Sequence, residues 1–282
     1  MADEWLIFVD TNIFLDFYRA SGESAKRQLN ALERHQNRLI TGDQVRMEFL
    51  NNRQRVILKS LNELKRPAKD GLPQIFSGTQ AARMMAKHQD NAIKKFKEIR
   101  TKAEKMLADP THHDQVFQTF NRIFDANTPL NLCRPKKERF AVRSLARKRF
   151  ALGYPPRKAG DNSIGDALNW EWIVRCAESS EPNQHILIVS RDGDFGAVHN
   201  GTAYLNDWLY REFKDRVSKK RKIELTARLT DALKRLDETV AAEDEREEEK
   251  IIREWDLEIS AEELEEIERS LDLGNLAEDC SA

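Results

Sequence analysis

The sequence predicts a three-layer α/β sandwich with a central parallel sheet. Residues 5–9 (WLIFV) and 186–190 (ILIVS) are apolar runs of strand length without polar alternation, which is typical of strands buried on both faces. Helical patterns separate these runs, and this order favours a parallel sheet. The chain has 282 residues, of which 40% are hydrophobic, enough for a large core.

The remaining elements follow from turn residues and helical spacing. Pro67 and the Gly/Pro-rich stretch after it separate two helices, and Val116, Phe120 and Ile123 have the spacing of one helix face. The predicted elements are strands at 5–9, 38–41, 186–190 and 203–205, and helices at 13–20, 25–34, 44–64, 80–107, between Pro110 and Pro129, at 136–151, from Asp166 and from Asp207.

The charges divide the chain into parts. Residues 51–150 carry 23 basic and 9 acidic side chains, whereas residues 237–282 carry 4 basic and 19 acidic ones. We therefore expect a domain over residues 1–236 with a basic helical insertion at about 51–152, followed by an acidic helical tail over residues 237–282. Clustered Lys and Arg are typical of polyanion binding, although a solvated helical surface is the plainer alternative.

Carboxylates occur where the predicted strands and helices begin or end. Asp10 follows the first apolar run, Asp166 begins a helix, and Asp192 and Asp194 follow the run at 186–190. Each is also suited to a helix cap or a turn. Together they would meet at the carboxyl edge of a parallel sheet, where open α/β sheets place their sites. Oxygen ligands of this kind suit Mg²⁺ or Mn²⁺, so the pattern indicates metal-dependent chemistry on phosphate.

Glu48 lies near the apolar stripe of its helix, between Val45 and Phe49. A carboxylate turned inward must be paired or bound to a metal. A salt bridge to Arg46, Arg53 or another basic residue is the alternative to a metal site.

Four motifs together resemble the PIN domain, a metal-dependent nuclease fold, and its PIN-like DUF4935 subgroup. They are VDTN from Val9, Glu48, GDALNW from Gly165 and VSRDGDF from Val189. The resemblance implies that Asp10, Glu48, Asp166 and Asp192 are catalytic metal ligands and that Asp194 is a further ligand. It also implies supporting roles for Asn12 and Ser190, and Asp161 is a supporting candidate from its place in the preceding loop.

The implied function is a Mg²⁺- or Mn²⁺-dependent endoribonuclease that hydrolyses phosphodiester bonds of single-stranded RNA, with a toxin or phage-defence role among the options. A structure-specific DNA nuclease and a non-catalytic nucleic-acid-binding module are the alternatives. Few aromatic residues alternate with the basic ones, so we expect contact with the nucleic-acid backbone. The candidate residues are Lys94, Lys95, Lys97, Arg100, Lys136, Lys137, Arg139, Arg143, Arg147, Lys148 and Arg149.

The sequence also bears on partners and location. No apolar run approaches the ~20 residues of a membrane span, and no secretion signal is evident. The cysteines Cys133, Cys176 and Cys280 form no paired motif, which fits a reducing cytoplasm. The acidic tail is expected to contact the basic insertion or a partner protein. A homo-oligomer is a further option that the sequence does not decide.

Overall fold

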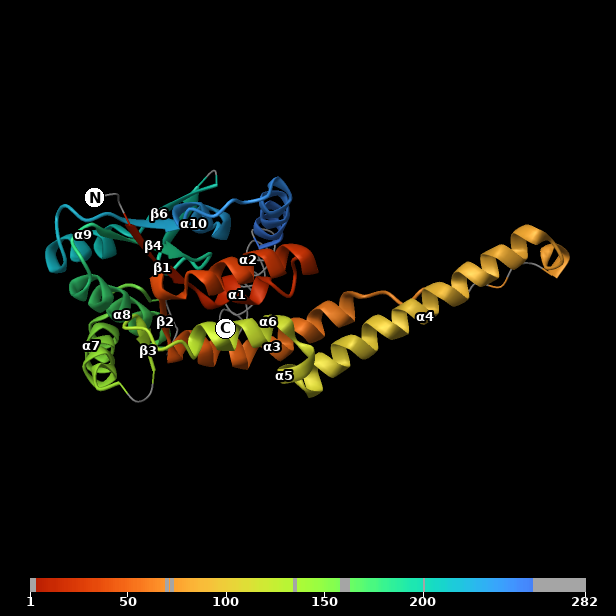
Figure 1. The fold of residues 1–282 in the computed structure, drawn as a ribbon, viewed down its shortest axis with the longest axis horizontal. Helices are drawn as coiled ribbons and strands as arrows, with labels where there is room; N and C mark the ends of the chain where they lie inside the picture. Colours follow the sequence, from red (N-terminus) through yellow and green to blue (C-terminus); the bar gives the residue numbers. More distant parts are fainter. Residues whose placement is uncertain are drawn as a thin grey trace, which may run out of the picture.

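The computed structural model describes residues 4–68, 71, 74–133, 136–157, 163–199 and 201–255. At its centre is a parallel sheet of five strands in the order β3-β2-β1-β4-β7, and helices flank it on both faces (Figure 1). The strands are β1 (Glu4–Val9), β2 (Leu39–Gly42), β3 (Asn131–Leu132), β4 (Gln184–Val189) and β7 (Ile223–Thr226). The three-layer α/β sandwich with a central parallel sheet is therefore confirmed.

The two apolar runs form the middle of this sheet as β1 and β4. Their side chains at 6–9 and 186–189 are each at most 3% exposed, and Val9 lies opposite Val189. β1 is followed by β2 and β3 on one side of the sheet, whereas β4 neighbours β7 on the other side. The carboxyl ends of β1 and β4 therefore lie at the point where the strand order reverses.

Helices and a small hairpin complete the domain. The helices are α1 (Thr11–Asp16), α2 (Gly22–Arg34), α3 (Asp43–Glu63), α4 (Gln80–Ala108), α5 (Pro110–His113), α6 (Gln115–Phe124), α7 (Glu138–Leu152), α8 (Gly165–Ser179), α9 (Asp207–Arg216) and α10 (Leu229–Arg235). Short 3-10 helices occur at Gln36–Arg38 and Gln74–Phe76, and the hairpin pairs β5 (Gly196–His199) with β6 (Thr202–Leu205). α8 packs on β2 and β4, and α10 packs on β1, β4 and β7. Within the described part of the chain, no helix has the length and apolarity to cross a bilayer.

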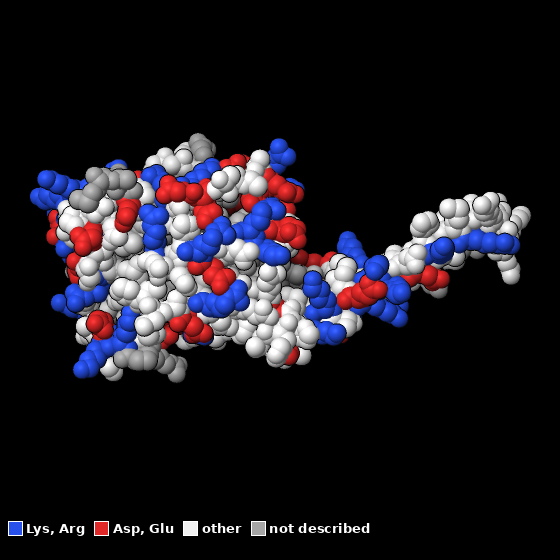
Figure 2. Space-filling model, in the orientation of Figure 1, with Lys and Arg blue, Asp and Glu red and all other residues white. Residues whose placement is uncertain are grey.

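A helical arm, formed by the end of α3, the 3-10 helix Gln74–Phe76 and α4, projects from the sheet domain (Figure 1). A buried ion pair between Arg53 and Asp114, 2.6 Å long, joins α3 to the start of α6 at its base. Tyr18 of the loop after α1 also donates a hydrogen bond to Asp114. Basic side chains lie along the arm in Figure 2.

The predicted insertion at 51–152 does not lie wholly outside the sheet domain. β3 is a strand of the central sheet, and α6 packs against α2. The segment therefore contributes both to the projecting arm and to the core.

The described part of the acidic tail, residues 237–255, packs on the sheet domain, and its residues 242–255 are helical. Asp244 pairs with Arg27 of α2 at 2.5 Å, and Glu238 pairs with Arg34 at 2.7 Å. These partners differ from the predicted contact with the basic insertion, although Glu254 lines a hollow together with side chains of α3. Residues 256–282 of the tail lie outside the described residues.

Candidate active site

Asp10 lies at the switch point of the sheet, directly after β1. Its backbone N–H donates to the carbonyl of Val189 at 3.0 Å, which ties the end of β1 to the end of β4. Ser190, the residue after β4, donates a hydrogen bond from Oγ to Asp10 Oδ2 at 2.5 Å. The register of the two strands thus brings together an acid and a hydroxyl that are 180 positions apart in the chain.

Further donors orient the Asp10 carboxylate, which is 5% exposed. The backbone N–H of Thr11 donates to Oδ1 at 2.6 Å, and Asn12 Nδ2 donates to Oδ2 at 3.1 Å. Asp10 also caps α1, so it serves as a helix cap and as a member of the cluster. Asn12 and Ser190 are the residues for which the resemblance implies supporting roles, and those roles stay a prediction.

Glu48 reaches the same site from α3. Thr11 Oγ1 donates to Glu48 Oε2 at 2.8 Å, and Gln44 Nε2 donates to Oε1 at 2.6 Å. The predicted alternative, a salt bridge to Arg46 or Arg53, is not what the geometry shows, because Arg46 pairs with Asp125 and Arg53 with Asp114. The sequence analysis missed Gln44, although its position four residues before Glu48 places both side chains on one helix face.

Gly165 makes room for the Glu48 carboxylate. A Cβ atom at this glycine would lie 2.6 Å from Glu48 Oε1 and 2.7 Å from Gln44 Nε2. Gly165 begins α8, so the absence of a side chain lets the start of α8 approach α3 closely. Asp166, the next residue, is thereby held beside the cluster.

The loop after β4 supplies the last acids. The N–H of Asp192 donates to Ser190 Oγ at 3.0 Å, and the N–H of Asp194 donates to Asp192 Oδ1 at 3.4 Å. Asp194 is 8% exposed, and its side chain shares a hydrogen bond with Asp166. Asp161, the remaining predicted supporting acid, lies outside the described residues.

Burial makes ionisation of Asp10 unfavourable. Its pKa is raised from 3.8 to about 7, chiefly by desolvation. The hydrogen bonds from Ser190 and Thr11 oppose this rise, and the charges of Asp192 and Glu48 add to it. Without a cation, Asp10 is therefore partly protonated at neutral pH.

Asp166 shows the same behaviour more strongly. Desolvation is again the largest cause of its raised pKa, followed by the charges of Asp10, Asp194 and Asp192. The charge of Asp10 thus disfavours ionisation of Asp166, and the titrations of these two acids belong to the pair rather than to single residues.

The donor set suits a divalent cation, because carboxylate oxygens are the ligands that Mg²⁺ and Mn²⁺ prefer and a cation would replace the protons on Asp10 and Asp166. In the ranges that the structure describes, however, no group of three or more Asp, Glu, His or Cys side chains has the arrangement of a metal site. The acids interact pairwise and through charge, and closer approach of their oxygens would be needed for shared coordination.

The predicted nucleic-acid-binding residues fall into different environments. Arg139 and Arg143 of α7 line a hollow together with Asp43 and Gln44, and Gln44 is the residue that donates to Glu48. Lys94, Lys95, Lys97 and Arg100 lie on the arm, where Lys95 pairs with Glu98 and Arg100 with Glu104. Lys137, Arg147 and Lys148 are exposed at α7.

Arg149 does not belong to this surface, and its prediction is corrected. Its side chain is 4% exposed and forms ion pairs with Glu171 and Glu212, and it also donates to the carbonyl of Pro155. Arg149 therefore fastens α7 to α8 and α9. Lys136 is half-buried and donates to the backbone carbonyls of Thr128 and Pro129.

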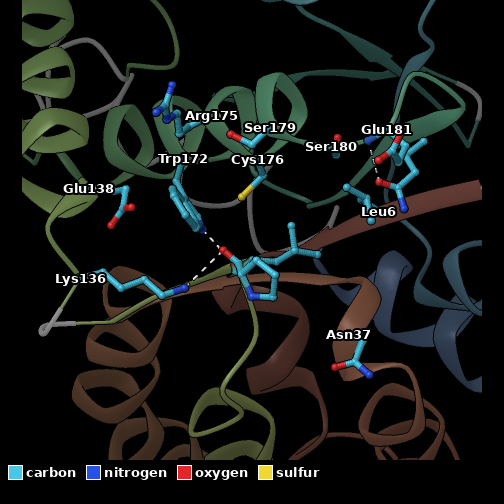
Figure 3. Close-up of a pocket in the computed structure, with 13 residues that line it drawn as sticks. Leu6, Asn37, Lys136, Glu138, Trp172, Arg175, Cys176, Ser179, Ser180 and Glu181 are labelled. Carbon is cyan, nitrogen blue, oxygen red and sulfur yellow. Dashed lines mark hydrogen bonds between the residues drawn. The ribbon is translucent and has the colours of Figure 1, made fainter.

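The cavity shown in Figure 3, about 570 Å³ in volume, lies away from the acids. Leu6, Gln184 and Leu130 place it at the amino ends of β1, β4 and β3. Trp172 and Lys136 in its wall donate to nearby backbone carbonyls. Because sites of open parallel sheets form at the carboxyl ends of the strands, the acidic cluster is the better candidate.

Comparison with known proteins identifies the family of the chain. Residues 7–195 match the PIN domain family, and this range contains all five acids of the cluster. No curated protein and no solved structure gave a match. The family match does not distinguish the DUF4935 subgroup, which stays a prediction. Because the match covers more than half of the chain, the protein belongs to the PIN domain family.

Proposed function

We propose that the protein is a metal-dependent endoribonuclease that hydrolyses phosphodiester bonds of single-stranded RNA. The PIN domain is a nuclease fold, and this supports hydrolysis of nucleic acid as the general activity. The single observation that carries the proposal is the gathering of Asp10, Glu48 and Asp192 at the switch point, where Thr11 and Ser190 connect them by hydrogen bonds. Such a cluster is costly for the fold, and a role in binding cations would explain it.

Asp10, Glu48, Asp166 and Asp192 would hold Mg²⁺ or Mn²⁺, with Asp194 as a further ligand. A bound ion would activate the attacking water and stabilise the leaving oxygen. Ser190 and Asn12 hold the Asp10 carboxylate in one orientation, and Thr11 does the same for Glu48. Gly165 keeps the space that Glu48 requires.

Positive charge near the cluster would bind the substrate backbone. Arg139 and Arg143 line the hollow beside Gln44, and Arg147 follows them at the same four-residue spacing along α7. We assign these three residues to the phosphates near the cleavage point and the lysines of the arm to more distant nucleotides. Backbone contacts without aromatic stacking favour binding that depends strongly on salt.

A cleavage assay on labelled single-stranded RNA, single-stranded DNA and flap DNA, each with Mg²⁺, Mn²⁺ or EDTA, tests the proposal. We expect metal-dependent cleavage of the RNA by the wild type and none by Asp10→Asn. Preferential cleavage of flap DNA would favour the alternative DNA nuclease, and binding without cleavage would favour the non-catalytic module. A role in toxin or phage defence is a further step that depends on this result.

A deletion that tests the role of the acidic tail should remove only residues 256–282. The helix at 242–255 packs on the sheet domain, so its removal would also disturb the fold. Residues 256–282 carry 10 acidic and 1 basic side chains. If this end competes with RNA for the basic surface, a chain ending at residue 255 should bind RNA more tightly at low salt. Unchanged affinity would favour a role in binding another protein.

A further inference from the structure

Arg191 lies between Ser190 and Asp192, within the loop that carries the acids. Its guanidinium, however, pairs with acids outside the cluster. Its side chain is 6% exposed and forms ion pairs with Asp16 at the end of α1 and with Glu248 of the tail helix, the latter at 3.3 Å. The backbone on both sides of Arg191 belongs to the site, because Ser190 donates to Asp10 and Asp192 donates to Ser190. The buried guanidinium therefore connects the loop to two distant parts of the chain.

Glu248 is itself firmly held, at 5% exposure. Its carboxylate accepts hydrogen bonds from the N–H groups of Leu229 at 2.5 Å and Thr230 at 3.0 Å, and from Thr230 Oγ1 at 2.6 Å. These groups form the first turn of α10, whose own N-cap residue, Arg228, supplies no side-chain hydrogen bond. Glu248 thus caps α10 from the tail helix while it pairs with Arg191.

A second contact joins the same tail helix to α1. Trp255 Nε1 donates to Asp16 Oδ1 at 3.0 Å, and the guanidinium of Arg19 lies 5.3 Å from the centre of the Trp255 ring. α1 begins at Thr11, which orients both Asp10 and Glu48. The tail helix therefore contacts two of the segments at the switch point, α1 and the loop after β4.

We infer that the helix at 242–255 is a positioning element for the active site, and that Glu248 acts through Arg191 to fix the loop that carries Asp192 and Asp194. The role of this loop in cleavage rests on the proposed function, whereas its dependence on Glu248 does not. Arg191 and Glu248 are positioning residues, since they hold the loop without contacting the reacting atoms.

Charge and burial explain why this contact would control the loop. If Glu248 lost its charge, the buried guanidinium of Arg191 would keep Asp16 as an ion-pair partner but would lose the second of its two acidic partners. Removal of one partner from a buried pair leaves an uncompensated charge, which destabilises the surrounding structure. The loop between Ser190 and Asp194 is short, so a shift of the Arg191 side chain towards solvent would move the acids beside it.

Asp244 provides a matched control on the same helix. It is also buried, at 3% exposure, and it pairs with Arg27 of α2, outside the active-site loop. Glu248→Gln and Asp244→Asn each replace one tail carboxylate by the corresponding amide. If the tail helix only stabilises the fold, both variants should change hydrogen exchange at 190–195 to a similar extent.

The experiment compares hydrogen exchange of the backbone amides at 190–195 in the full-length wild type, Glu248→Gln and Asp244→Asn. We expect faster exchange at these amides in Glu248→Gln alone, even where the melting temperatures of the two variants fall equally. In the cleavage assay, Glu248→Gln should lower kcat by about 10-fold or more and leave KM unchanged. Loss of a residue that supports a metal ligand typically has an effect of this size. Glu248→Asp keeps the negative charge on a shorter side chain, so its exchange rates and kcat should lie between those of the wild type and Glu248→Gln.

Equal exchange at 190–195 in both amide variants would overturn the inference. If Glu248→Gln does not fold, Glu248→Asp takes its place, and exchange like that of Asp244→Asn would then overturn it. A wild type that cleaves no nucleic acid would refute the proposed function, whereas the exchange comparison would still decide the role of Glu248.

Discussion

Replacing Asp10 by asparagine should flatten the pH dependence of stability in the metal-free protein. The folded protein favours the neutral form of Asp10, since burial raises its pKa from 3.8 to about 7. Between these values the folded state binds more protons at Asp10 than the unfolded chain does, so the contribution of Asp10 to stability is greatest at low pH and is lost as the pH rises through about 7. A side chain that does not titrate removes this contribution.

The size of the effect follows from the shift. Raising the pKa of Asp10 from 3.8 to about 7 lowers the free energy of unfolding by about 4 kcal/mol once Asp10 is fully ionised. The part of this stability that is lost between pH 5 and pH 8 is about 2–3 kcal/mol. Asp10→Asn should also reduce the raised pKa of Asp166, because the charge of Asp10 is one of its causes. The variant loses one acceptor for the donors Ser190 and Asn12, which costs about 1–3 kcal/mol at every pH.

Urea unfolding in EDTA at several pH values from 5 to 8 measures this difference. We expect the wild type to lose at least 2 kcal/mol more than Asp10→Asn over this range, as worked out above from the pKa shift. Equal slopes for the two proteins would refute the argument, since Asp10 would then ionise as easily in the fold as in the unfolded chain.

Three further predictions concern Gly165 and two arginines of α7. Gly165→Ala should displace Glu48 and lower kcat by about 100-fold, because its Cβ would lie 2.6 Å from Glu48 Oε1, whereas Gly22→Ala, with open space around it, should cleave like the wild type. Arg143→Ala should weaken RNA binding and reduce the slope of log K against log salt by about 1, which a titration at several salt concentrations measures. Arg149→Met should instead lower the free energy of unfolding by about 3–5 kcal/mol in urea denaturation, because it breaks a buried ion-pair network. A salt slope changed by Arg149→Met and not by Arg143→Ala would contradict the assignment.

The middle of the fold could be predicted from the sequence because its signals are local. β1 and β4 are apolar runs without alternation, and the acids that follow them come directly after the last buried residue. β3 could not be predicted in this way, because two residues give no periodicity. β7 does show alternating burial, but it follows directly after the basic stretch 219–222 and was missed together with α10.

Other features depend on contacts between distant segments. Arg149 lies on the buried face of α7 with Val142 and Ala146, a spacing visible in the sequence, yet its acidic partners are on α8 and α9. For the same reason, the sequence predicts that the tail contacts the basic insertion or a partner protein, and does not predict its contacts with the sheet domain. Its buried carboxylates find their partners in α2, α10 and the β4 loop, and local sequence gives no sign of these pairings.

Binding of Mn²⁺ tests the central claim most directly, namely that the acids at the switch point form one cation site. A titration followed by the electron paramagnetic resonance signal of free Mn²⁺ gives the affinity without reference to activity. The account predicts binding by the wild type and loss of most of it in both Asp10→Asn and Asp166→Asn, which lie on different elements of the fold. Wild-type affinity in both variants would contradict it.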